Sequence, residues 1–177
     1  MTMDRQTLHD LIEARWAIPV LALLHRDDGA RFAVMAHRLA VAPQSLSRTL
    51  AHLIERGWVV RNAGHGHPLR PEYLLTAVGE PVGAACARIV AAREQLGLSP
   101  RDVPRWSLPV AIGLGDEWLR FGALQHRIGR ATPRALSMTL KTMIVHDLVG
   151  RRLEASFPPV ALYGLTPRGR DLARAAA

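Results

Sequence analysis

The chain has 177 residues, of which 49% are apolar, so it can bury one core or two small ones and is neither a disordered nor a collagen-like chain. The single cysteine, Cys86, excludes an intrachain disulfide. No apolar run reaches the roughly 18 to 20 residues of a membrane span, and the polar N-terminus is unlike a signal peptide. Together these features predict a soluble cytoplasmic protein. The net charge of +8 favours a polyanionic partner without deciding for one.

The first half of the chain predicts a helix-turn-helix. Pro19 suits the first turn of a helix whose apolar residues recur at helical spacing. After an Asp-Asp-Gly turn, a short helix is predicted over 32–39 and a second over 43–56, which Gly57 is placed to end. Two helices joined by a short turn, the second with a polar outer face, are typical of this motif. The predicted core stripe of the second helix is Leu46, Leu50, Leu53 and Ile54.

A β-hairpin, or wing, is predicted to follow the second helix. Residues 58–61 form a short β-type run, 62–68 a glycine-rich loop and 72–76 a second strand. Thr76 is placed to cap a long helix that runs, after Pro81, towards Leu96.

The second half repeats the first at an offset of about 90 residues. Arg15-Trp16 recurs as Arg105-Trp106, and Tyr73 with Leu75-Thr76 and Gly79 recurs as Tyr163 with Leu165-Thr166 and Gly169. The fold class is therefore mainly α with small β-hairpin wings, in two tandem winged helix-turn-helix domains. The predicted parts are a first domain over 1–98 that ends in a linking helix, a linker over 99–104, and a second domain over 105–177 with recognition helix 133–147, strands 148–152 and 162–166, and final helix 167–175.

The motifs resemble those of HxlR-type winged helix regulators. They are Arg-Phe at 31–32, Leu-Ser-x-Thr-Leu at 46–50, Gly-Trp-Val-Val-Arg at 57–61 and Glu-Tyr-x-Leu-Thr-x-x-Gly at 72–79. The resemblance covers nearly all of 8–96 and, more weakly, 105–175, while a bare helix-turn-helix also suits MarR- or PadR-like proteins. It implies homodimers that bind palindromic DNA, so two fused copies imply an intramolecular pseudo-dimer. The second copy departs from the pattern because no acidic residue precedes Tyr163, and no cysteine precedes Trp16, where thiol-sensing members carry theirs.

The polar face of each recognition helix supplies the candidate base-reading residues. Arg48 and Arg134 match the guanine edge, and Gln44 matches the adenine edge. The others are suited to phosphate, and the competing interpretation is a solvated helix face. The candidates are Gln44, Ser45, Ser47, Arg48 and His52 in the first copy and Arg134, Ser137, Lys141 and Thr142 in the second.

The wings and the charge distribution add a second group of candidates. Wing side chains can reach phosphates or the minor groove, and the alternative is a solvated hairpin. Residues 1–98 carry a net charge of +2 and 99–177 carry +6, which makes the second half the stronger candidate for a polyanion. The basic residues are almost all Arg, which suits phosphate and guanine but also fits a GC-rich genome. The wing candidates are Arg61, His65, His67, Arg70, Arg151 and Arg152.

Two tryptophans at equivalent positions, Trp16 and Trp106, are candidates for binding a small hydrophobic effector, and the alternative is that both are core anchors. His65 and His67 form at most half of a metal site, so neither a metal nor a cofactor is expected. Cys86 is expected to be a buried, inert thiol. Catalytic motifs such as a nucleophile elbow or a P-loop are absent, so no enzyme is expected.

Two functions compete at this point. The leading one is a sequence-specific transcription regulator, expected to be a repressor, that binds a double-stranded DNA operator as a monomeric pseudo-dimer or as a homodimer, with a hydrophobic effector as its expected regulator. The alternative is a protein that binds or sequesters a small molecule on the duplicated scaffold, because a fold does not fix a function.

Overall fold

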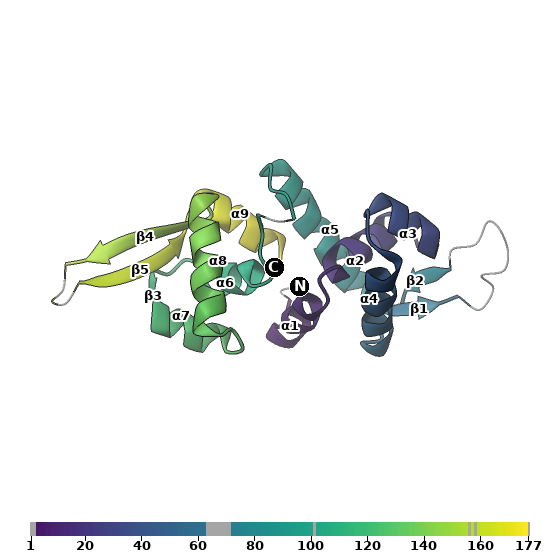
Figure 1. Ribbon diagram of the computed structural model, residues 1–177, viewed down its shortest axis with the longest axis horizontal. Coiled ribbons are helices and arrows are strands. Elements are labelled where there is room, and N and C mark those ends of the chain that lie inside the picture. The colour runs from purple at the N-terminus through teal and green to yellow at the C-terminus, as the bar shows by residue number, and fades with distance from the viewer. Residues whose placement is uncertain (1–2, 63–71, 101, 156, 158, 177) are drawn as a thin grey trace. The chain divides into compact units, whose positions relative to one another are not determined.

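The structure is a computed structural model that describes residues 3–62, 72–100, 102–155, 157 and 159–176. It divides into two compact units, Met1–Ala91 and Ala92–Ala177 (Figure 1). The division falls within helix α5 (Gly79–Gln95), so the last turn of that helix and residues 99–104 belong with the second unit.

The first unit combines helices with a two-stranded antiparallel hairpin. Asp4 starts the first helix by accepting a hydrogen bond from the Thr7 N–H at 3.0 Å. Pro43 lies in the first turn of the recognition helix, where a missing N–H costs no helical hydrogen bond. The elements are α1 (Arg5–Glu13), α2 (Ala17–Arg26), α3 (Phe32–Arg38), α4 (Pro43–Glu55), β1 (Val59–Arg61), β2 (Tyr73–Leu75) and α5. The largest fully buried side chains of this unit are Leu11, Leu21, Leu23, Leu24, Met35, Leu46, Leu53 and Ile89.

The second unit repeats this plan with a larger sheet. Its strands run antiparallel in the order β3-β5-β4, and the β4–β5 hairpin extends from the helices (Figure 1). In the second unit, Leu119 of β3 pairs with Tyr163. The equivalent pair in the first unit, Ala30 and Tyr73, forms an isolated antiparallel bridge. The elements are α6 (Ser107–Leu114), β3 (Leu119–Arg120), α7 (Phe121–Ile128), α8 (Pro133–Val145), β4 (Val149–Glu154), β5 (Val160–Leu165) and α9 (Pro167–Ala175).

The repeated Thr-x-x-Gly motif closes each wing onto the next helix. Thr166 accepts a hydrogen bond from the Gly169 N–H at 3.1 Å and donates one of 2.6 Å to the Asp147 carbonyl. Thr76 makes the equivalent bonds to the Gly79 N–H and the Gly57 carbonyl, at 2.9 and 2.6 Å. The predicted cap at Thr76 is therefore confirmed. The threonine links the end of the recognition helix to the start of the following helix in both units.

The structure differs from the sequence prediction in several boundaries and in one core residue. Ile54 is 42% exposed, and Thr49 is buried in its place. At about 100° per residue, Thr49 and Ile54 flank the stripe of Leu46, Leu50 and Leu53 at equal angles on opposite sides, so tertiary packing decides that Thr49 is the buried one. Helix α5 begins at Gly79 rather than after Pro81, and α8 ends at Val145 rather than at 147. The second wing is longer than predicted, because cross-strand pairing continues to Glu154 and Val160.

Candidate nucleic-acid interface

The outer face of α4 carries the candidate base-reading residues of the first unit. Leu46, Leu50 and Leu53 are buried, which leaves Gln44, Ser47 and Arg48 exposed on the opposite side. Ser45 is half-buried, and its carbonyl accepts a hydrogen bond of 3.0 Å from the Thr49 hydroxyl.

The outer face of α8 differs in chemistry although its backbone is equivalent. Arg134 and Lys141 are exposed, and Met138 between them is 57% exposed. Thr142 is half-buried and donates its hydroxyl to the Met138 carbonyl at 3.2 Å. Ser137 is half-buried. Sequence reasoning missed Met138, although a helical wheel places it on the same stripe as Arg134 and Lys141.

The exposed Arg and Lys side chains of α4 and α8 have no acidic partner among the described residues. Among the described residues, Arg48, Arg134 and Lys141 form no ion pair or hydrogen bond with another side chain, whereas many other basic side chains of the chain do. Unpaired, exposed guanidinium groups keep their forked donors available for a phosphate or a guanine edge.

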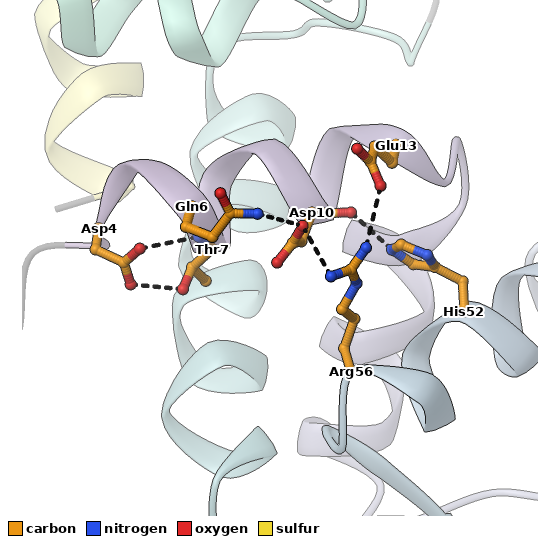
Figure 2. Close-up of polar contacts among 7 residues, drawn as sticks. All are labelled: Asp4, Gln6, Thr7, Asp10, Glu13, His52 and Arg56. Carbon is orange, nitrogen blue, oxygen red and sulfur yellow. Dashed lines mark hydrogen bonds and ion pairs between the residues drawn. The ribbon is translucent and has the colours of Figure 1, made fainter.

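Helix α1 contacts the C-terminal half of α4 and explains the orientation of the His52 side chain (Figure 2). His52 Nε2 donates to the Asp10 carbonyl at 2.8 Å, so this side chain faces α1. Arg56 lies 3.4 Å from the Asp10 carboxylate and 3.4 Å from Glu13. The Asp10 carboxylate also accepts from Gln6 Nε2 at 2.9 Å. Sequence analysis did not predict α1, and with it missed the contact that orients His52 inward.

The wings differ between the two units. Arg61 donates to Glu72 at 2.8 Å, so an acidic partner offsets its charge. His65, His67 and Arg70 lie outside the described residues. On the second wing, Arg151 is exposed and, within the described part of the chain, has no charged or hydrogen-bonding partner. Arg152 is exposed and lies over the ring of Trp118, with its Cζ 4.4 Å from the ring centroid.

Comparison with known proteins agrees with this geometry. The family model described as HxlR-like helix-turn-helix matches residues 103–176, and the MarR family model matches residues 6–67. An uncharacterized HTH-type transcriptional regulator of Methanothermobacter thermautotrophicus is 32% identical over 68 residues, which are 38% of this chain and 52% of that protein. Two tandem helix-turn-helix domains therefore fit the family models, the first similar to the MarR family and the second similar to HxlR-like proteins.

Two solved structures are also similar to one half of this tandem helix-turn-helix protein. A MarR-family protein of Porphyromonas gingivalis is 22% identical, with a TM-score of 0.40 over 48% of this chain and 78% of its own. One of Enterococcus faecalis is 29% identical, with a TM-score of 0.41 over 49% and 74%. The HxlR-like model matches the second domain, where the motifs are less complete, and the first domain, where they are more complete, matches the MarR model.

The remaining candidates from the sequence are the two tryptophans and the cysteine of the tandem helix-turn-helix protein. Trp16 and Trp106 are half-buried at the starts of α2 and α6, and each lies under the preceding arginine, whose Cζ is 5.5 or 5.6 Å from the ring centroid. These two residues remain the positions at which a hydrophobic effector would be sought. Burial raises the pKa of the Cys86 thiol. Across the described ranges, no group of three or more His, Cys, Asp or Glu gathers as for a metal, and no helix is long and apolar enough to span a bilayer.

Proposed function

We propose that this protein is a sequence-specific DNA-binding transcription regulator whose two recognition helices, α4 and α8, each read bases in a major groove. The observation that carries the proposal is the exposed, uncompensated set of Arg48, Arg134 and Lys141 on the outer faces of these helices. Their faces opposite the core also carry polar side chains that suit base edges and phosphate.

The roles follow from side-chain chemistry. Arg48 and Arg134 are suited to bidentate contacts with the O6 and N7 atoms of guanine, and Gln44 to adenine. Lys141 and Ser47 are suited to phosphate. We leave His52 and Thr142 out of the contact set, because each side chain is hydrogen-bonded to a backbone carbonyl of its own domain.

Helices α4 and α8 present different side chains at equivalent positions, so we propose an asymmetric operator. At the offset of 90, Gln44 corresponds to Arg134 and Arg48 to Met138. An exposed methionine offers no hydrogen bond to guanine, but it can contact the methyl group of thymine. The half-site read by α8 is therefore expected to differ from the half-site read by α4.

Binding-site selection from a random duplex pool at two stated salt concentrations, using the full chain, tests the proposal. We expect two half-sites of different sequence. Arg48→Ala should relax one base in one half and Arg134→Ala one base in the other, each with a loss of about tenfold in affinity. The matched control is Arg88→Ala, which removes an exposed arginine from α5 and should change neither half. Failure to enrich any motif would overturn the proposal.

Exchange of one pair of equivalent residues between α4 and α8 gives a second test of the asymmetry. The double variant Arg48→Met with Met138→Arg should interchange the preferences at the corresponding operator positions. An operator that keeps its sequence under this exchange would contradict the assigned contacts.

We further propose that one chain occupies both half-sites and represses by covering promoter DNA. Half-sites for two linked helix-turn-helix domains should be centred about one helical turn, roughly 34 Å, apart or a multiple of it. Native mass spectrometry on the selected duplex should show one chain per two half-sites, and two chains would contradict this stoichiometry. Transcription from a template with the operator across the start site should fall as protein is added, whereas a rise would indicate an activator.

A further inference from the structure

An indole ring lies flat on the backbone of the second wing. Gly150 of β4 and Gly164 of β5 form a directly opposed pair. A Cβ built on Gly164 would lie 2.6 Å from the Trp118 ring, and one on Gly150 would lie 3.1 Å from it. The distance at Gly164 leaves no space for a side chain, and the one at Gly150 is so tight that the ring would have to give by a few tenths of an ångström.

The same ring carries Arg152 on the wing. Arg152 follows Gly150 by two residues along β4, so both lie on one face of the hairpin. The Arg152 Cζ lies 4.4 Å from the Trp118 ring centroid, and Trp118 is still 38% exposed. Stacking uses the flat face of the guanidinium and leaves the N–H groups at its edge available as donors.

The charge of Arg152 has no carboxylate partner among the described residues. The acidic residue on the same face, Glu154, accepts a hydrogen bond of 3.0 Å from Arg120. The interaction with Trp118 leaves the formal positive charge of Arg152 in place, because an aromatic ring contributes only a quadrupole.

The first domain has no such arrangement. At the repeat offset, Val60 and Leu74 replace the two glycines, and Asn62 replaces Arg152. Trp118 corresponds to Gly29, because Ala30 and Leu119, the residues that follow them, pair with the equivalent Tyr73 and Tyr163. The large ring and the two small residues therefore occur together in one copy and are absent together from the other. Arg61, the basic residue of the first wing that lies among the described residues, is paired with Glu72 at 2.8 Å.

We propose that Trp118 is a positioning residue that holds Arg152 in place to contact a backbone phosphate of DNA beside the half-site read by α8. This inference rests on the proposed DNA-binding function and assigns Arg152 of the second wing as a phosphate contact. An arginine that is already stacked loses less rotamer freedom when it binds, so its phosphate contact is stronger than that of a free arginine.

A double-mutant cycle on the full chain tests the inference, with affinity for the selected duplex measured from low to moderate salt. Arg152→Ala should weaken binding about fivefold to tenfold and lower the slope of log affinity against log salt by about 1, the effect of one phosphate contact. Trp118→Leu should weaken binding about threefold to fivefold in the Arg152 protein and leave it unchanged in the Arg152→Ala background. Trp118→Phe, which preserves a stacking face, should bind close to the original protein.

Controls separate positioning from folding. Thermal unfolding identifies any variant that is not folded at the assay temperature. Should Trp118→Leu fail that test, Gly164→Ala, whose Cβ would lie 2.6 Å from the ring and so must displace it, replaces it in the cycle. Arg151→Ala is the matched wing control, because Arg151 lies on the other face of β4, and its effect should be the same with or without Trp118.

The outcomes distinguish this inference from the proposed function. If Trp118→Leu or its substitute weakens binding equally in both backgrounds, or weakens it in neither, the positioning role is overturned while the regulator proposal stands. An unchanged salt slope in Arg152→Ala overturns the phosphate contact alone. Absence of any selected duplex overturns the proposed function itself.

Discussion

The carbonyl oxygen of Leu148 occupies the space that a Cβ on Gly169 would need. Gly79 has the same relationship to the carbonyl of Trp58 in the first domain. We predict that Gly169→Ala and Gly79→Ala each lower the free energy of unfolding by about 1–3 kcal/mol or more, because backbone rather than a side chain must move. Urea denaturation of each variant measures this effect.

Gly122 supplies the matched control for these substitutions. It lies in α7, and a Cβ there would meet nothing within 4 Å. Gly122→Ala should therefore stabilise the protein by about 0.4–1 kcal/mol through the lower entropy of the unfolded chain. Equal effects at positions 122 and 169 would contradict the steric explanation of the repeated glycine.

Cys86 gives a chemical measure of the native packing of α5. Its side chain is fully buried, and burial raises its pKa above the usual range, so little reactive thiolate is present at neutral pH. We predict that a thiol reagent such as Ellman's reagent modifies one equivalent in denaturant and essentially none in the native protein over minutes. Rapid modification of the folded protein would show that this part of α5 opens readily.

The contact between α1 and α4 should contribute to stability through Asp10. This carboxylate is buried, accepts from Gln6 at 2.9 Å and lies 3.4 Å from Arg56 (Figure 2). We predict that Arg56→Met lowers the free energy of unfolding by about 1–3 kcal/mol, because it leaves a buried carboxylate short of a partner.

The exposed pair of Arg174 and Asp171 in α9 is the comparison, at 2.8 Å. Arg174→Met should cost about 0–1 kcal/mol, as is usual for surface ion pairs. If chemical denaturation gives Arg56→Met the same small cost as Arg174→Met, the α1 contact does not stabilise α4.

Local patterns predicted much of the fold. The apolar stripe of α4, the cap at Thr76 and both wings follow from periodicity and from the repeat, because these signals depend on residues close in the sequence. Helix α1 also had such a signal, since Asp4 precedes Leu8, Leu11 and Ile12 at helical spacing. The resemblance to the regulator family covers 8–96, so the start of α1 lies outside it.

Side-chain orientation was harder to predict because it depends on tertiary packing. His52 lies on the half-polar flank of α4, and only the position of α1 decides that it points inward. The site around Trp118 required comparison of three positions between the two copies. A tryptophan gained at one position gives no indication that glycine replaces a hydrophobic residue at two others. The register of the hairpin brings the three positions together.

The segment that precedes α6 should make the second domain sensitive to acid through Asp102. The hydrogen bond with the Ser99 side chain, and next the one of 2.7 Å from the Ser99 N–H, hold the pKa of Asp102 below its usual value, with smaller contributions from His146 and Arg93. A carboxyl group whose pKa is lower in the folded state than in the unfolded chain stabilises the fold fully above the unfolded value, which is about 3.9 for Asp. That contribution is lost as the pH falls through the folded pKa.

We therefore predict that the unfolding temperature falls as the pH is lowered from about 5 towards 3 and that Asp102→Asn makes this fall shallower. At neutral pH the same variant should unfold at a lower temperature, because the amide replaces the charged acceptor of the Ser99 N–H and the carboxylate that lies 3.4 Å from His146. Glu117 also has a lowered pKa, owing to its hydrogen bonds from Arg127, so part of the acid sensitivity should persist in Asp102→Asn and be smaller in the double variant with Glu117→Gln. The contribution of Asp4, whose pKa is lowered by its hydrogen bonds with Thr7, should remain in all three proteins. Calorimetric scans of the three proteins between pH 3 and 7 measure both effects, and parallel pH profiles for the original protein and the double variant would contradict the assignment to these two carboxylates.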